Sequence, residues 1–249
     1  MLYSKNLLLA MLKSIAFKTG LDLKRTVSQS TLESHLHFAI KLYDIDLVID
    51  VGANQGQFGQ LLRIIGYKGR ILSFEPLFSA FDTLRKEAQR DRNWTAVNLA
   101  LGSKSGTLEI NEYESSEFSS ALTPTTFADE RFGLSRSIRG KHFTPMETLD
   151  RYLEQHPERA KRIFLKMDTQ GYDLNVFAGA MNTMSRIFLL QSEISFQPVY
   201  DGIPDYKTSL LKFTNSGYFV TGIFPVSRGK DLSMIEADVV VARSFEDEE

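Results

Sequence analysis

The chain has 249 residues, of which 43% are hydrophobic and 24% charged, and its formal net charge is −2. This size and composition are typical of one large α/β domain, and the near-neutral charge gives no electrostatic basis for binding nucleic acid. The sequence contains no cysteine, which excludes disulfides, thiolate nucleophiles and cysteine-ligated zinc. Because this composition fits a reducing compartment, we expect a cytoplasmic protein.

Residues 1–44 are predicted to form an N-terminal helical extension. Lys13 interrupts the first apolar run and no small-residue cleavage site follows it, so the pattern is not that of a signal peptide. Leu8, Leu12 and Ile15 share one helical face, which favours a helix that packs on the domain or on a partner in a homodimer. Peripheral contact with a membrane through the nearby lysines is the less favoured alternative. A second helix is predicted over 31–43.

Residues 45–243 alternate between apolar strand patterns and amphipathic helix patterns. Strands are predicted over 46–51, 70–75, 94–102, 106–113, 162–168, 186–195, 219–226 and 236–243. Helices are predicted over 57–65, 78–90, 146–155, 172–181 and 206–218. The alternation predicts a doubly wound, mostly parallel sheet that ends in a hairpin with an antiparallel last strand. Residues 112–145 form an irregular polar segment, expected to be a substrate-binding or lid insertion, and 244–249 form an acidic tail.

The stretch "VIDVGANQGQFG" (48–59) is a strand followed by a glycine-rich turn. Its spacing is G-x-x-x-G-x-x-G, which differs from the G-x-G-x-x-G that cradles a pyrophosphate, and no G-K-[ST] follows. Asn54 tolerates a left-handed backbone, so the turn can still be tight. Glu75 ends the second strand, where a carboxylate can accept hydrogen bonds from both ribose hydroxyls. These features predict a ligand that contains adenosine but no pyrophosphate.

Five blocks occur in the order "VIDVGANQGQFGQLLR", "ILSFEPL", "VNLALGS", "LKMDTQGYDLNVFAGA" and "EISFQPVYDG". Over 45–243 this series resembles the FkbM-type methyltransferases, a branch of the class I S-adenosylmethionine-dependent enzymes. The resemblance implies a Rossmann-like, seven-stranded sheet whose last strand is antiparallel. It also implies methyl transfer from S-adenosylmethionine, commonly to a hydroxyl of a sugar or secondary metabolite.

The resemblance also implies which residues hold the cofactor. The methionine end would be wrapped by the glycine turn, the ribose held by Glu75, and the adenine enclosed by residues after the second and third strands. The residues concerned are Asp50, Gly52, Ala53, Asn54, Gly56, Gln57, Phe58, Glu75, Pro76, Leu77, Asn98, Leu99, Ala100 and Leu101.

An aliphatic hydroxyl accepts a methyl group only as its proton leaves, which requires a base or a metal ion. Asp168 ends the strand expected beside the first strand, so it is our candidate base, metal ligand or acceptor-orienting group, although capping the next helix is an alternative role. Glu193 ends the following strand and could be a second carboxylate of the site or a structural ion pair, and Lys166 is expected to pair with an acid. His142 could reach the site as a base. No histidine or carboxylate spacing signals a metal ion, although a divalent ion is compatible with these acids.

Residues of the 112–145 segment are candidates for binding the acceptor. Ser119 and Ser120 match serines in the corresponding block of the family. Arg131, Arg136 and Arg139 could hold a phosphate or carboxylate on a nucleotide- or lipid-linked sugar. A solvated basic loop is the competing interpretation.

Two other functions compete with O-methylation. A nicotinamide-dependent oxidoreductase could use the same sheet, but the sequence has neither G-x-G nor a Tyr-x-x-x-Lys pair. A non-catalytic cofactor-binding module would not need Asp168 and Glu193.

Overall fold

The structure is a computed structural model that describes residues 19, 30–115 and 118–244. The apolar helical face expected near the N-terminus and the acidic tail beyond residue 244 lie outside the described residues.

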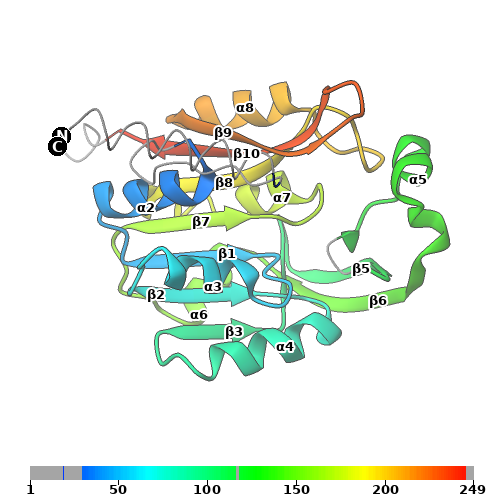
Figure 1. The fold of residues 1–249 in the computed structure, drawn as a ribbon. Coiled ribbons are helices and arrows are strands. Elements are labelled where there is room, and N and C mark those ends of the chain that lie inside the picture. The colour runs from blue at the N-terminus through cyan, green and yellow to red at the C-terminus, as the bar shows by residue number, and fades with distance from the viewer. Residues whose placement is uncertain (1–18, 20–29, 116–117, 245–249) are drawn as a thin grey trace, which may run out of the picture.

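A seven-stranded sheet forms the centre of the fold (Figure 1) and has the order β3-β2-β1-β7-β8-β10-β9. The strands are β1 Leu47–Val51, β2 Arg70–Phe74, β3 Trp94–Val97, β7 Ile163–Met167, β8 Ile187–Ser195, β9 Tyr218–Arg228 and β10 Met234–Arg243. The pairs among β1, β2, β3, β7 and β8 are parallel, whereas β10 is antiparallel to both β8 and β9. The predicted sheet, its hairpin and its antiparallel last strand are confirmed.

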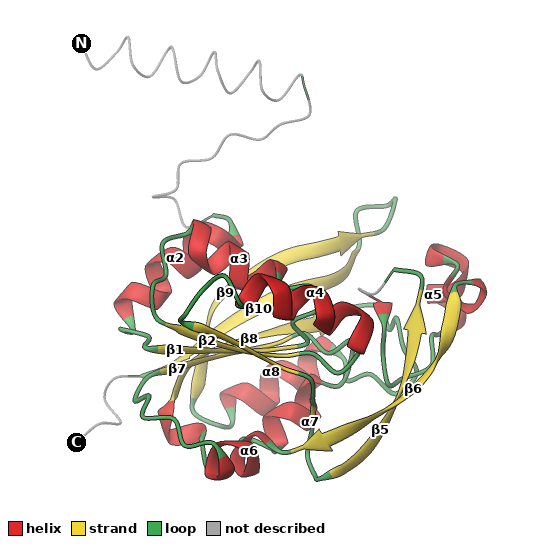
Figure 2. Cartoon of the chain, turned by 90° about the horizontal axis from the view of Figure 1, so that it is seen from below, coloured by secondary structure: helices red, strands yellow, loops and turns green. Residues whose placement is uncertain are grey.

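Helices cover both faces of this sheet (Figure 2). One face carries α2 Leu32–Leu42, α3 Gln57–Ile64 and α4 Phe78–Ala88, and the other carries α6 Leu149–Gln155, α7 Asp173–Ala178 and α8 Tyr206–Thr214. The 3-10 turn η4 spans Met184–Arg186. Within the described ranges no helix is both long and apolar enough to cross a bilayer.

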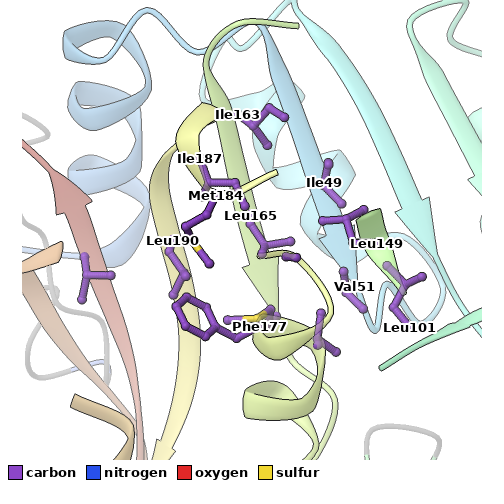
Figure 3. Packing of buried hydrophobic residues seen from close by; sticks show 14 of the residues in the cluster. Ile49, Val51, Leu101, Leu149, Ile163, Leu165, Phe177, Met184, Ile187 and Leu190 are labelled. Atoms are coloured by element: carbon purple, nitrogen blue, oxygen red, sulfur yellow. The ribbon is translucent and has the colours of Figure 1, made fainter. Parts of the chain in front are cut away.

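The buried strands are apolar on both faces because each face meets a helical layer. In β1, Ile49 and Val51 pack with Leu165 and Phe177 in one core cluster (Figure 3), whereas Val48 packs in the other cluster with α2 and α3. Asp50 shares the face of Val48, so the polar group described below lies on the side of α3.

A second sheet of three strands, with the order β4-β6-β5, lies beside the first (Figure 2). It consists of β4 Ala100–Leu101, β5 Gly106–Tyr113 and β6 Ile138–Glu147, and the helix α5 Thr126–Phe132 and the 3-10 turn η3 Leu134–Arg136 precede β6. Two expectations are therefore wrong. Residues 94–102 form two strands in different sheets rather than one strand, and residues 138–145 are not irregular because they pair with β5.

Candidate active site

A cavity of about 510 Å³ opens where β1, β2, β7 and β8 end. We call one part of its lining the glycine-loop end, formed by residues 51–54, 57–58, 74–77 and 99–101. We call the other part the carboxylate end, formed by Phe118–Ala121, Asp168–Gln170, Glu193, Glu236 and Asp238. Of the residues predicted to hold the cofactor, those that line the cavity are Gly52, Ala53, Asn54, Gln57, Phe58, Glu75, Pro76, Leu77, Leu99, Ala100 and Leu101. Asp50, Gly56 and Asn98 are not among the lining residues.

The glycine turn brings the backbones of β1 and β7 into close contact. Gly52 has φ +75°, and a Cβ atom there would lie 1.9 Å from the carbonyl oxygen of Asp168. Asn54 has φ 47°, the left-handed conformation that asparagine tolerates. Gly59 serves packing, since a Cβ atom there would lie 2.2 Å from the ring of Trp94. The loop can therefore adopt this conformation only with glycine at position 52. Its backbone lines the cavity just before the first turn of α3.

Glu75 presents a buried carboxylate at the glycine-loop end. Its Oε2 accepts a hydrogen bond from the Asn54 N–H (2.8 Å) and its Oε1 accepts one from the Leu77 N–H (2.9 Å). Burial raises the pKa of Glu75 to about 7, against the lowering effect of these hydrogen bonds. Each oxygen retains acceptor capacity toward a ligand hydroxyl, so the group suits a ribose.

Asn98 and Asp50 stand behind the lining. The Nδ2 of Asn98 donates to the carbonyls of Glu75 (2.8 Å) and Pro76 (3.0 Å), which fixes the turn after β2. Asp50 is fully buried and accepts from the Ser73 hydroxyl at 3.3 Å. Both residues therefore shape the site from outside the cavity.

Lys166 joins the two ends of the cavity. Its Nζ lies 3.0 Å from Asp50 Oδ1 and 3.5 Å from Asp168 Oδ2, and it donates to the Gly52 carbonyl at 3.2 Å. Burial alone would lower the pKa of Lys166, but the carboxylates of Asp50 and Asp168 outweigh it and raise the pKa, so the ammonium stays charged. The predicted ion pair is confirmed.

The carboxylate end gathers acids from three strands. Asp168 follows β7 with 40% of its side chain exposed, and Glu193 on β8 is the register partner of Asp238 on β10. Glu236 lies two residues from Asp238 and so on the same face. Lys166 is the sole basic side chain among the described residues that line the cavity.

Burial and the neighbouring charges raise the pKa values of two of these acids, Glu193 and Asp238. Burial and the charges of Asp168, Glu236 and Asp238 raise the pKa of Glu193 well above its ordinary value. Burial and the charge of Asp168 raise the pKa of Asp238 to about 6. The carboxylate end therefore favours a ligand that donates hydrogen bonds over one that brings further negative charge. Within the described residues no group of three or more histidine and acidic side chains is arranged to hold a metal ion.

Asp168 does not cap the helix that follows it. The N-cap of α7 is Tyr172, which makes no side-chain cap hydrogen bond. The turn is held instead by buried Asp173, which accepts from the Thr169 N–H (2.9 Å) and from the Ser192 hydroxyl (2.7 Å). The Asp168 carboxylate is thus left facing the cavity.

The remaining predicted residues divide into two groups. Ser119 and Ser120 line the cavity, and the Ser120 hydroxyl donates to the Gln170 carbonyl at 2.7 Å. His142 does not reach the cavity, because it lies on β6 with its Nε2 2.7 Å from Glu112 Oε2. Arg131 and Arg139 are exposed and outside the lining, and Arg136 ends η3.

The cavity residues that the sequence analysis did not name as site residues include Gln170, Gln191, Glu236 and Asp238. Glu236 and Asp238 had a detectable signal, since they are charged residues that alternate with the apolar side chains of a buried strand. Gln170 and Gln191 had none, because uncharged side chains within or after a strand are common in any sheet.

The residues at the glycine-loop end fit S-adenosylmethionine. Glycine at 52 lets the loop backbone approach a ligand closely, and the Glu75 oxygens can accept further hydrogen bonds. Among the described residues that line this end, none is basic, so no cluster is present to bind a pyrophosphate. A sheet of this strand order, with a glycine turn after β1 and an acid after β2, is typical of the class I S-adenosylmethionine-dependent methyltransferases.

The sequence model of the FkbM methyltransferase domain matches residues 50–220, and the chain belongs to this family. The resemblance seen in the sequence is confirmed, and the oxidoreductase and non-catalytic alternatives are set aside.

Solved structures that are similar to this chain at low identity include two methyltransferases. Magnesium protoporphyrin IX methyltransferase from Synechocystis PCC 6803, with bound S-adenosylmethionine, is 9% identical with a TM-score of 0.46, over 85% of this chain and 79% of that one. A precorrin-6y C5,15-methyltransferase from Geobacter metallireducens GS-15 is 13% identical with a TM-score of 0.46, over 86% and 88%. No curated protein sequence matches this chain significantly.

Proposed function

We propose that this methyltransferase acts on a hydroxyl of a small acceptor, a sugar or another hydroxylated metabolite, with Asp168 receiving the hydroxyl proton. The observation that carries the proposal is the contact of the Asp168 backbone with Gly52, which sets a half-exposed carboxylate directly beside the glycine loop. S-adenosylmethionine supplies a methyl group already activated on its sulfonium. The task left to the protein is to orient the acceptor and to take its proton.

The charge of the cavity supports a neutral or cationic acceptor rather than a phosphorylated one. Four carboxylates line the carboxylate end, from Asp168, Glu193, Glu236 and Asp238, and Lys166 is already engaged by Asp50. The exposed Arg131 and Arg139 side chains do not line it. The phosphates of a nucleotide-linked sugar would therefore meet no available basic side chain among the described residues that line the cavity.

Residues 112–145 are proposed as the acceptor-covering part of a methyltransferase domain that spans 45–243. Phe118, Ser119, Ser120 and Phe132 come from this segment and line the cavity. Isolated bridges from Asn111 to Ser120 and from Pro124 to Tyr200 attach it to the rest of the fold. These contacts support a wall of the acceptor site that is built separately from the central sheet.

The test is an assay of S-adenosylhomocysteine release with three classes of acceptor: neutral methyl glycosides, aminosugar methyl glycosides and nucleoside-diphosphate sugars. We expect turnover with the first or second class. Asp168→Asn should lower turnover by at least about 100-fold, as loss of a general base does, while S-adenosylhomocysteine binding stays within about twofold. Turnover confined to the phosphorylated sugars, or full activity in Asp168→Asn, would contradict the proposal.

A further inference from the structure

Gln170 lies between the two candidate acceptor-side carboxylates. Its Nε2 is 3.2 Å from Asp168 Oδ1 and 3.3 Å from Glu193 Oε2. A carboxamide nitrogen carries two hydrogens, so it can donate one to each carboxylate. The side chain thereby connects the end of β7 to β8 across the cavity.

The other end of the Gln170 carboxamide is anchored by Tyr200. The buried Tyr200 hydroxyl lies 3.1 Å from Gln170 Oε1 and 2.7 Å from the Phe118 carbonyl oxygen, and it can donate to either one. Because carboxylates accept hydrogen bonds, the amide nitrogen must face Asp168 and Glu193 and the amide oxygen must face Tyr200. The orientation of the amide is set by its surroundings.

The backbone of Gln170 is held in an uncommon conformation. Its φ is 52°, and Gly171 follows with φ 92°. A non-glycine residue in this region costs about 1 kcal/mol or more and persists only where neighbours hold it. Here the Ser120 hydroxyl donates to the Gln170 carbonyl at 2.7 Å, and Gly171 packs so closely that a Cβ atom would lie 2.8 Å from Leu122.

We propose that Gln170 is a positioning residue that holds Asp168 and Glu193 in a fixed geometry and ties them to the acceptor-covering segment through Ser120 and Tyr200. This inference rests on the proposed function, because it assigns Gln170 to the pair that contains the candidate base. A neutral donor suits the place: it satisfies both carboxylates without adding charge, whereas a third acid would increase their repulsion.

We call the Gln170 carboxamide, with its hydrogen bonds to Asp168 and Glu193, the bridge. Two substitutions test separately whether its length and its uncharged donor matter. Gln170→Asn keeps an amide and tolerates the left-handed backbone, but its side chain is one methylene shorter and withdraws from the carboxylates. Gln170→Glu keeps the length and replaces the donor by an acid. The same two changes at Gln89, an exposed residue at the end of α4, are the matched controls.

The direct measurement is a pH titration of the Glu193 carboxyl carbon by ¹³C NMR in the complex with S-adenosylhomocysteine, which needs no acceptor. The charged and titratable groups around Glu193 are Asp168, Asp173, Tyr200, Glu236 and Asp238, and Lys166 lines the same cavity. Loss of the amide donor leaves these surrounding groups in place but removes a hydrogen bond that stabilises the charged form of Glu193. We expect its midpoint to move to higher pH in both Gln170 variants and to stay in place in both Gln89 variants.

The second measurement is turnover with the acceptor class identified above. Both Gln170 variants should lose at least about tenfold in kcat, as misplacement of a reacting group does, with S-adenosylhomocysteine affinity within about twofold of wild type. An unchanged Glu193 titration and an unchanged kcat would overturn the inference. So would a parallel loss of S-adenosylhomocysteine binding, which would indicate general damage to the site.

The inference and the proposed function fail differently. Full activity in Asp168→Asn removes the proposed base and leaves the NMR titration to decide whether Gln170 bridges the carboxylates. Loss of activity in Asp168→Asn together with wild-type behaviour of both Gln170 variants rejects the bridge alone.

Discussion

The two ends of the cavity are built by different means. The glycine-loop end is shaped by backbone, through Gly52 and the N–H groups that hold Glu75, and its residues lie in short segments within the stretch 51–101. The carboxylate end is assembled from side chains on β7, β8 and β10, which are distant in sequence. Replacing a side chain disturbs a fold less than moving a backbone segment. Enzymes that use the same cofactor can therefore keep the glycine-loop end, whereas the carboxylate end can change with the acceptor.

The ion pair between Asp50 and Lys166 joins the two ends, so breaking it should have the largest effect on stability. Lys166→Met leaves the Asp50 carboxylate, 0% exposed, without its cation, and should cost about 3–5 kcal/mol in the free energy of unfolding. Urea unfolding measures the change. Lys86→Met is the control, since Lys86 pairs with Asp82 at the surface and its loss should cost less than about 1 kcal/mol. Equal costs for the two variants would contradict this role of the buried pair.

The backbone character of the glycine-loop end can be tested with alanine. Gly52→Ala combines a left-handed φ with a clash against the Asp168 carbonyl and should destabilise the fold by about 3 kcal/mol. Gly66→Ala shares the left-handed φ, but its Cβ atom would meet nothing within 4 Å. That control should cost about 1 kcal/mol, and thermal or urea unfolding of both proteins gives the difference. A Gly52→Ala protein as stable as Gly66→Ala would show that the contact between β1 and β7 yields easily.

Glu75 should make cofactor binding depend on pH. Its pKa of about 7 means that the ionised form, the better acceptor for ribose hydroxyls, becomes dominant as the pH rises through 7. S-adenosylhomocysteine should therefore bind up to about tenfold more tightly at pH 8 than at pH 6 by calorimetry. Glu75→Gln cannot titrate, so any slope that it retains belongs to other groups. Identical slopes in the two proteins would exclude Glu75 as the source.

The smallest effect is expected at the exposed arginines. If the carboxylate end alone recognises the acceptor, Arg131→Gln and Arg139→Gln should change KM for a neutral acceptor by less than about twofold, because neither side chain lines the cavity. Steady-state kinetics decide the matter. A large rise in KM would bring back the anion-binding interpretation of this segment.

The glycine-loop end was largely predictable because its signals are local. Continuous apolar runs identified β1 and β7, and the spacing of glycines with Asn54 and Glu75 indicated the ligand class. The same local approach failed over 138–145, where β6 is mostly exposed and is a strand because it pairs with β5. His142 was expected at the site for this reason, and the pairing places it beside Glu112 instead.

The carboxylate end depends on contacts that no window of sequence contains. Asp168 and Glu193 could be found because strand ends meet at one edge of a parallel sheet. Asp238 enters only because β10 inserts beside β8 in one register, and a shift by one residue would turn it to the opposite face. The position of Gln170 depends on a backbone held by Ser120 and on a carboxamide anchored by Tyr200, both far away along the chain.

The position of β10 between β8 and β9 also determines when the sheet can be completed during synthesis of the chain. A ribosome must translate beyond Arg243 before the last interior strand can pair, so β8 remains an uncovered apolar edge while β9 has already emerged. Glu236 and Asp238 then reach the cavity together with the strand that closes the sheet. Until β10 pairs, the exposed edge of β8 in a nascent chain can therefore pair with other chains and aggregate. Pairing of β10 completes the central sheet and brings Glu236 and Asp238 to the carboxylate end in the same late step.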